Sequence, residues 1–283
     1  MAEQEVLVLR SARYLDSSKV VTFFSRDGGL QSGFARGATS RDNRFGASLE
    51  PLTRSRLSLR RGSFTGLVRI LHADTRHSYP HIREDYDRLV WAGLIVRFLL
   101  GFLPEGHPEP RLFDLASLAL ERLDGRESPA GLVWMEFVRE GLPILGWGIP
   151  PPVCRSCGKT EGGEDMESGE AGRSRRFAYR PSDGAVFCRS CRPVDPEGRL
   201  WAVAPEVISF LSGSPQVKGS SAGGRRSLPS PVREALAFLD RVIGEHISRW
   251  IAVADLSFVG GGGTGLEDEE VDPDRGRDHD EGA

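Results

Sequence analysis

Hydrophobic and polar positions alternate in short runs over residues 1–77. Residues 6–9 and 20–24 are rich in β-branched and aromatic side chains, a composition that favours β-strands. Asp27-Gly28-Gly29 predicts a turn, and residues 30–35 predict the returning strand of a hairpin. Strand-like alternation resumes later in the segment, without helical spacing. The pattern therefore predicts a small closed β-barrel.

The hydrophobic period lengthens to three or four residues from about residue 82, which predicts helices. One helix ends at Leu103-Pro104, a second begins at Pro110, and a third covers about residues 132–145. Ser230-Pro231 predicts the N-cap and first position of a further helix. The apolar face of that helix carries Val232, Leu236, Leu239, Ile243, Ile247 and Trp250.

All four cysteines lie in two C-x-x-C pairs, Cys154/Cys157 and Cys188/Cys191. Each pair brings two thiolates to one tight turn, and four thiolates complete the tetrahedral shell of a structural Zn²⁺. Between the pairs, residues 175–187 alternate around a Pro-Ser-Asp-Gly turn, which predicts the hairpin of a zinc ribbon. We expect one structural zinc ion per chain. The alternatives are a redox dithiol, which needs a strand-to-helix junction, and disulfides, which need a secretory context.

These elements predict an α+β chain in several parts. The expected parts are a barrel at 1–77, a first helical part at 78–150, a zinc-ribbon module at 151–196, a second helical part at 197–258 and a disordered acidic tail at 259–283. Two Gly/Ser-rich segments, 161–174 and 212–227, are also expected to be disordered.

Charge is distributed unevenly along the chain, although the net charge is only −3. Residues 1–77 hold 13 Lys and Arg against 7 Asp and Glu, a net charge of +6. Residues 264–283 hold 2 Arg against 9 acidic residues, a net charge of −7. The near-neutral total therefore conceals a basic barrel, which favours a nucleic-acid partner. The acidic tail is either inert or a competitor of DNA for the basic face.

Basic residues concentrate in one predicted loop of the barrel and on the strand after it. The candidate DNA contacts are Arg36, Arg41, Arg44, Phe45, Arg54, Arg56 and Arg60. Cations that follow phosphates and an aromatic ring that stacks on a base are features of barrels that bind single strands. The three strand arginines alternate with other residues and therefore share one face. For this strand, a solvated face in an arginine-rich sequence is the alternative.

Several other classes of protein lack support in the sequence. The longest apolar run, residues 89–103, contains Arg97 and is shorter than the roughly 20 residues of a membrane span. The N-terminus has no signal-peptide pattern, so we expect a cytoplasmic protein. Gly158-Lys159-Thr160 lacks the first glycine of a P-loop, and the glycines at 260–265 precede acidic residues instead of a helix. We expect no nucleotide cofactor, no membrane partner and, without a nucleophile–base group, no enzyme.

The order of these features resembles the RecO family of bacterial recombination mediators. The matching stretches are VLRS (8–11), VVTFFSRDGG (20–29), ARGA (35–38), LEPL (49–52), IRED (82–85), LPE (103–105), LFD (112–114), residues 137–146 and the two C-x-x-C pairs. The resemblance covers about residues 4–255. The insertion near 161–174 and the tail beyond 260 depart from the family pattern.

The resemblance implies an N-terminal OB-fold barrel and a C-terminal helical domain with an inserted four-cysteine zinc ribbon. It also implies an activity: binding single- and double-stranded DNA, annealing complementary strands, and acting with RecR to load RecA on SSB-coated DNA. The alternative is a zinc-ribbon scaffold or transcription-associated factor that binds proteins and does not anneal DNA.

Overall fold

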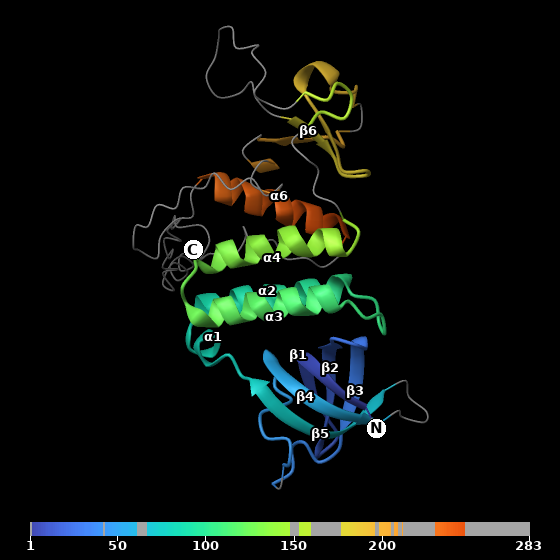
Figure 1. Ribbon diagram of the computed structural model, residues 1–283, viewed down its shortest axis with the longest axis vertical. Helices are drawn as coiled ribbons and strands as arrows, with labels where there is room; N and C mark the ends of the chain where they lie inside the picture. Colours follow the sequence, from blue (N-terminus) through green and yellow to red (C-terminus); the bar gives the residue numbers. More distant parts are fainter. Residues whose placement is uncertain are drawn as a thin grey trace, which may run out of the picture.

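The N-terminal part of the chain forms a closed β-barrel, as the alternation predicts (Figure 1). The computed structural model describes residues 2–41, 43–60, 67–147, 153–159, 177–195, 198–204, 207–208, 211 and 230–246. The barrel strands are β1 (Ala2–Tyr14), β2 (Ser18–Ser25), β3 (Gly29–Ala35), β4 (Thr53–Arg60) and β5 (Val68–His77). Neighbouring strands follow the order β1-β2-β3-β5-β4, and the β3–β5 pair is parallel. The barrel is OB-like, and the predicted fold class is confirmed.

Apolar side chains fill the barrel because alternate strand positions point inward. The interior cluster consists of Val6, Val8, Val21, Phe23, Ala35, Ala38, Phe45, Leu49, Leu57, Leu59, Ile70 and Ala73. Gly33 lies where β3 meets β5, and a Cβ there would lie 2.9 Å from Ile70 and 3.1 Å from Phe23. The absence of a side chain at Gly33 therefore makes room for these two residues where the barrel closes.

Helices stack on the barrel in successive layers, with α2 and α3 nearer the barrel than α4 and α6 (Figure 1). The described helices are α1 (Pro80–Glu84), α2 (Tyr86–Phe102), α3 (Pro110–Gly125), α4 (Ala130–Ile144) and α6 (Ser230–His246). Asp85 separates α1 from α2 because its backbone is extended. Its side chain caps α2 by accepting hydrogen bonds from the N–H groups of Asp87 at 3.0 Å and Arg88 at 3.3 Å.

One hydrophobic core extends from the outer wall of the barrel through the helices. Phe24 of β2 meets Phe113 of α3 edge to face, with ring centroids 5.6 Å apart. Deeper in the helical part, Phe98 of α2 contacts Phe137 of α4 at 5.2 Å in the same manner. The barrel is therefore joined to the helices by buried aromatic packing.

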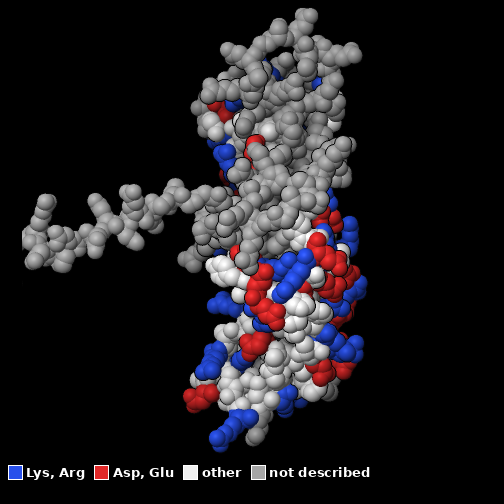
Figure 2. Space-filling model, turned by 90° about the vertical axis from the view of Figure 1, so that its left-hand side faces the viewer, with Lys and Arg blue, Asp and Glu red and all other residues white. Residues whose placement is uncertain are grey.

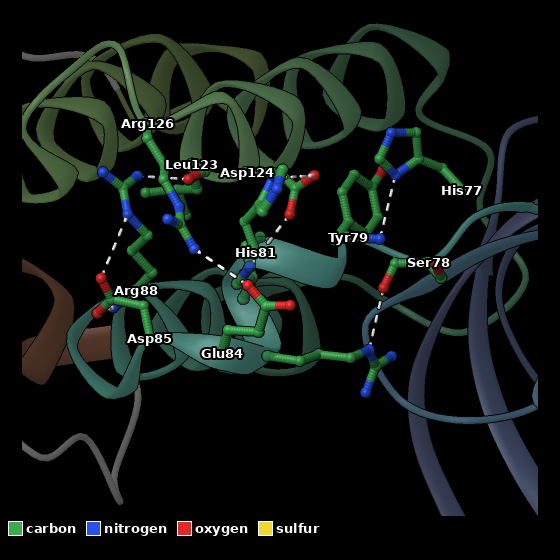
Figure 3. Close-up of polar contacts among 12 residues, drawn as sticks. His77, Ser78, Tyr79, His81, Glu84, Asp85, Arg88, Leu123, Asp124 and Arg126 are labelled. Atoms are coloured by element: carbon green, nitrogen blue, oxygen red, sulfur yellow. Dashed lines mark hydrogen bonds and ion pairs between the residues drawn. The ribbon is translucent and has the colours of Figure 1, made fainter.

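The chain crosses from the barrel to the helices at Tyr79, whose φ of 48° places it in the left-handed region. The Tyr79 N–H donates to Nδ1 of His77 at 3.1 Å (Figure 3). The next hydrogen bond joins the Ile82 N–H to Oδ1 of Asp124 at 3.0 Å, near the end of α3. This connection is thus fixed by two hydrogen bonds, of which that to Asp124 is buried, as well as by packing.

A small sheet forms the end of the molecule opposite the barrel (Figure 1). It contains β6 (Phe177–Arg180), β7 (Ala185–Phe187) and β8 (Trp201–Val203), in the order β7-β6-β8. The β6–β7 pair is the predicted hairpin, and β8 is a third strand that the sequence pattern did not indicate. Tyr179 packs edge to face on Phe238 of α6, with centroids 5.0 Å apart, which attaches the sheet to the helices.

Several expected features lie outside the described residues. These are the segments 161–174 and 212–227, the tail at 259–283, and Ile247 and Trp250 of the last helix. Within the part of the chain that the structure describes, no helix is long and apolar enough to cross a membrane.

Candidate nucleic-acid surface and metal centre

The four cysteines converge at the end of the hairpin, although the two pairs are far apart in the sequence. Cys154 and Cys157 come from a turn before β6, and Cys188 and Cys191 come from the turn after β7. Their Sγ atoms all lie within 4.8 Å of one another, and those of Cys157 and Cys188 are 3.8 Å apart. Four sulfurs at about 2.3 Å from a tetrahedral zinc lie about 3.8 Å from each other. The cluster could hold a metal ion, and its donor set is consistent with zinc.

Backbone hydrogen bonds shape both cysteine turns. The Gly158 N–H donates to the Cys154 carbonyl at 2.9 Å, and Gly158 has a φ of +70° that favours glycine. In the second turn, the Cys191 N–H donates to the Cys188 carbonyl at 3.1 Å. The first turn is also fastened to β7, because the Arg155 N–H donates to the Val186 carbonyl at 2.8 Å.

The thiols differ in their tendency to ionise. Burial opposes ionisation of Cys154, but hydrogen bonds from the backbone at Cys188, Cys157 and Ser156 outweigh it and lower its pKa to about 6. Hydrogen bonds with the sulfurs of Cys188 and Cys157 instead raise the pKa of Cys191 to about 12. The cluster therefore favours one thiolate, and a divalent cation would stabilise the others.

Asp183 links the hairpin turn to the first cysteine turn. Arg180 donates to it from Nε at 2.9 Å and from Nη2 at 2.6 Å, and Arg155 donates from Nη1 at 3.3 Å. The hydrogen bond from Arg180 lowers the pKa of Asp183, which stays ionised. This carboxylate therefore organises the loop that carries two of the four sulfurs.

Three of the predicted DNA contacts, Arg36, Arg41 and Arg44, form what we call the arginine loop between β3 and β4. All three side chains are exposed, and none forms an ion pair with a residue that the structure describes. The loop is fastened to the β1–β2 turn, because Thr39 donates from its N–H to the Ser17 carbonyl at 3.0 Å. Among the described residues, these three guanidinium groups beside the turn therefore have no carboxylate partner.

Phe45 does not belong to the exposed part of the loop, contrary to the prediction. Its side chain is 2% exposed and packs in the barrel interior with Ala38 and Leu49. The Phe45 N–H donates to Oδ1 of Asn43 at 3.0 Å, which turns the chain inward at this point. The ring closes one end of the barrel and cannot stack on a base, so we correct this assignment.

The three arginines of β4 have different surroundings. Arg54 is held between two carboxylates, at 2.6 Å from Nε to Glu5 and 2.6 Å from Nη1 to Glu121 of α3. It joins barrel to helix, and we leave it out of the DNA surface. Arg56 is exposed and lies 4.0 Å from a carboxylate oxygen of Glu3. Arg60 is exposed and forms no ion pair within the described chain.

Sequence reasoning missed an aromatic pair on the outer wall of the barrel. Tyr14 at the end of β1 is 51% exposed, and its ring meets that of Phe34 at right angles with centroids 5.8 Å apart. Phe34 stands between Gly33 and Ala35, both buried, so its ring points outward. In the sequence, this reversed alternation, with small residues inward and a large one outward, was the signal that could have indicated an exposed aromatic side chain at Phe34.

Basic side chains project from the lower end of the molecule, which the barrel forms, and acidic side chains also lie there (Figure 2). On the same face, basic and acidic side chains are mixed over the helices above it. Ion pairs account for part of this mixture, such as that between Arg122 and Glu136 on neighbouring helices at 2.5 Å.

Comparisons with known proteins agree with this architecture. One family model, described as Recombination protein O N terminal, matches residues 1–79, and another, Recombination protein O C terminal, matches residues 83–253. A protein named DNA repair protein RecO from Geobacter metallireducens is 34% identical over 247 residues, covering 87% of this chain and 92% of the relative. Another of that name from Rubrobacter xylanophilus is 30% identical over 241 residues, covering 85% and 88%.

The fold and its sites thus define a protein with an OB-like barrel, a helical region and a four-cysteine cluster that could bind a metal. Within that class, the chain belongs to the recombination protein O family, a family of DNA repair proteins.

Proposed function

We propose that this protein is a recombination mediator of the bacterial cytoplasm. It binds single- and double-stranded DNA through the barrel, anneals complementary strands and, with RecR, promotes loading of RecA onto SSB-coated single strands. The observation that carries the DNA-binding part is the arginine loop, whose three exposed guanidinium groups lack ion pairs among the described residues. Membership of a DNA repair family supports the same assignment. The assignment of RecR, SSB and RecA as partners rests on the family resemblance alone.

Annealing by such a surface needs no bond-breaking chemistry. Two complementary strands repel each other through their phosphates, and guanidinium groups that neutralise those phosphates reduce the repulsion. Arg36, Arg41 and Arg44 are suited to this because a guanidinium donates two parallel hydrogen bonds to a phosphate. We therefore propose a binding protein and not an enzyme.

The metal in this proposal is one zinc ion per chain, held by Cys154, Cys157, Cys188 and Cys191. When bound, zinc would supply structural cross-linking, because four sulfurs fill a tetrahedral shell and leave no position for a reacting water. The residues around it hold the two cysteine turns in place, as Asp183 does through Arg155. Metal analysis of the purified protein should return close to one zinc per chain, and a value near zero would contradict the assignment.

The DNA-binding proposal is tested by replacing Arg36, Arg41 and Arg44 together with glutamine in the full chain. Binding to a fluorescent single strand is measured by anisotropy at several salt concentrations. The logarithm of the affinity should depend less steeply on the logarithm of salt concentration, by roughly 0.7 for each phosphate that is no longer neutralised. Annealing of complementary strands, bare and SSB-coated, with and without RecR, is measured with the same variants.

A matched control removes the same charge elsewhere. Arg111, Arg126 and Arg139 lie on or beside α3 and α4, and their triple glutamine variant also loses three positive charges. It should retain the wild-type salt dependence. An unchanged slope in the arginine-loop variant would refute the proposed surface. Absence of annealing by the wild type, with intact complexes with partner proteins, would favour a protein-binding scaffold instead.

A further inference from the structure

We propose that Tyr14 and Phe34 form a stacking site for the unpaired bases of single-stranded DNA. We call these two residues the aromatic pair. Through it, the barrel gains affinity for single strands that it does not gain for duplex DNA. The inference rests on the proposed function, because it assumes that the barrel binds DNA, and it identifies which form of DNA this wall of the barrel selects.

The geometry of the aromatic pair leaves ring surface available to a ligand. The rings meet at an interplanar angle of 88°, with centroids 5.8 Å apart. Because rings at right angles touch through one edge, each ring keeps at least one face away from its partner. Tyr14 is 51% exposed, so this surface is open to solvent and does not belong to the barrel interior.

On the side of Phe34 that faces β2 and β1, the neighbours in the same row are small. Phe34 pairs with Val20 of β2, and Val20 pairs with Ala12 of β1. Both neighbours are smaller than the aromatic rings and are at least partly exposed. A flat base can therefore approach the rings from the β1–β2 side without displacing a large side chain.

Positive charge surrounds the aromatic pair on the same strands and on the next one. Arg10 of β1 is exposed and shares the strand face of Tyr14, and Arg69 of β5 is the direct partner of Phe34 in the sheet. Arg13 is also exposed, but it alternates with Tyr14 and belongs to the other face of β1. None of these three arginines forms an ion pair with a residue that the structure describes. A stacked base would thus have guanidinium groups nearby for its flanking phosphates.

The arginine loop lies next to the aromatic pair as well. Thr39 of that loop donates from its N–H to the Ser17 carbonyl at 3.0 Å and from its hydroxyl to the Asp16 carbonyl at 3.2 Å. Ser17 and Asp16 form the β1–β2 turn that directly follows Tyr14. The loop cations and the aromatic rings therefore belong to one continuous surface, which suits a strand that runs past both.

The preference for single strands follows from what each form of DNA exposes. Bases in a duplex are stacked on each other, so only the terminal pairs present a free face. An unpaired base presents its face to any ring that can reach it, whatever its sequence. The arginines bind phosphates in both forms, whereas the aromatic pair contributes to the single-stranded form alone.

The test compares Tyr14→Ala and Tyr14→Phe in the full chain. Binding to oligo(dT) and to a duplex of equal length is measured by fluorescence anisotropy over a range of salt concentrations. Tyr14→Ala should weaken oligo(dT) binding roughly 5-fold or more, since stacking of a base on an aromatic ring contributes at least that factor. Its salt slope and duplex affinity should stay unchanged because no cation is lost, and Tyr14→Phe should bind as the wild type does.

Tyr86→Ala is the matched control. Tyr86 is a 73% exposed tyrosine on α2, between Asp85 and Asp87, and its removal should leave oligo(dT) affinity unchanged. As a measurement that needs no variant, a strand containing 5-iododeoxyuridine is photocrosslinked to the wild type. The crosslinked peptide should contain Tyr14 or Phe34.

Each result decides the inference. Wild-type affinity for oligo(dT) in a folded Tyr14→Ala variant, or an equal loss for single strands and duplex, would overturn it while the proposed function stands. Crosslinking confined to the helical part would overturn it as well. If the wild type binds neither form of DNA, the proposed function itself fails, and that outcome is visible before any variant is compared.

Discussion

Replacing Phe45 separates a packing role from a DNA-contact role within the arginine loop. The side chain is 2% exposed and belongs to the barrel interior, where Phe→Ala substitutions cost about 3–5 kcal/mol of the free energy of unfolding. The guanidinium of Arg44 also lies 5.0 Å from the ring centroid, a contact of about 0.5–1 kcal/mol at an exposed site. A whole domain is stable by only about 5–15 kcal/mol. Phe45→Ala should therefore remove a large part of the stability of the barrel.

Phe45→Leu keeps most of the buried volume and should cost only about 1 kcal/mol. Urea unfolding is followed for both variants by far-UV circular dichroism and by hydrogen exchange of barrel amides. Tryptophan fluorescence is a poor probe here, because all five tryptophans follow residue 90, outside the barrel. The expected order of stability is wild type, then Phe45→Leu, then Phe45→Ala.

The DNA measurement decides between the two roles. Folded Phe45→Leu should bind oligo(dT) with wild-type affinity, because the ring closes the barrel and faces no ligand. The reasoning is refuted if Phe45→Leu unfolds at the wild-type urea concentration yet binds single strands at least fivefold more weakly.

Three further substitutions test interactions elsewhere in the molecule. Arg54→Gln should lower the free energy of unfolding by about 1 kcal/mol, because two glutamates lose their shared cation. Its affinity for oligo(dT) should stay within twofold of the wild type. A loss of binding free energy larger than the loss of unfolding free energy would place Arg54 on the DNA surface. The hydrogen bond from Arg26 lowers the pKa of Asp114, so this pair stabilises the fold above the unfolded carboxyl pKa of about 4 and loses its effect as the pH falls through the lower folded value. Urea unfolding should accordingly show Asp114→Asn less stable than the wild type at pH 7, with the gap narrowing as the pH falls below about 4. An unchanged gap at low pH would contradict this. Cys154→Ser should abolish stoichiometric zinc, measured by mass spectrometry of the metal, and full retention would exclude Cys154 as a ligand.

Local sequence patterns were sufficient for the barrel and the hairpin of the ribbon. Alternation in β2 and β3 reports which side chains enter the barrel, because side-chain direction in a strand depends only on position parity. The two C-x-x-C pairs predicted the convergence of four sulfurs, since the turn geometry of each pair is local and a hairpin between them returns the chain. These predictions needed no knowledge of long-range packing.

Phe45 and Tyr14 show where local patterns fail. A loop rich in polar residues suggests that all of its residues are exposed. The open end of a barrel must nevertheless be closed by an apolar side chain. Phe45 lies where the loop crosses that end, so its side chain is buried. Tyr14 is the last residue of β1, and whether such a residue is covered depends on how the next turn and loop fold back. Neither outcome is encoded in the period of the strand.

Strand β8 and the role of Arg54 depend on tertiary structure in the same way. Three residues, Trp201–Val203, are too few for a period to be recognised, and β6 supplies the pairing that makes them a strand. Arg54 faces Glu121 only because α3 lies over this part of the barrel. A sequence can indicate that an arginine is exposed on a strand, but not which helix will cover it.

The position of the metal centre relative to the proposed DNA surface determines what each site can influence. The cysteine cluster belongs to the small sheet, and the helical layers lie between that sheet and the barrel (Figure 1). Tyr179 and Trp201 attach the sheet to α6, with Arg241 of α6 placed 4.1 Å above the ring of Trp201. Loss of metal should therefore act first on the sheet and its packing on α6. DNA binding depends on the opposite end, so a protein stripped of zinc should keep its affinity for oligo(dT) for as long as the barrel and the helices beside it remain folded.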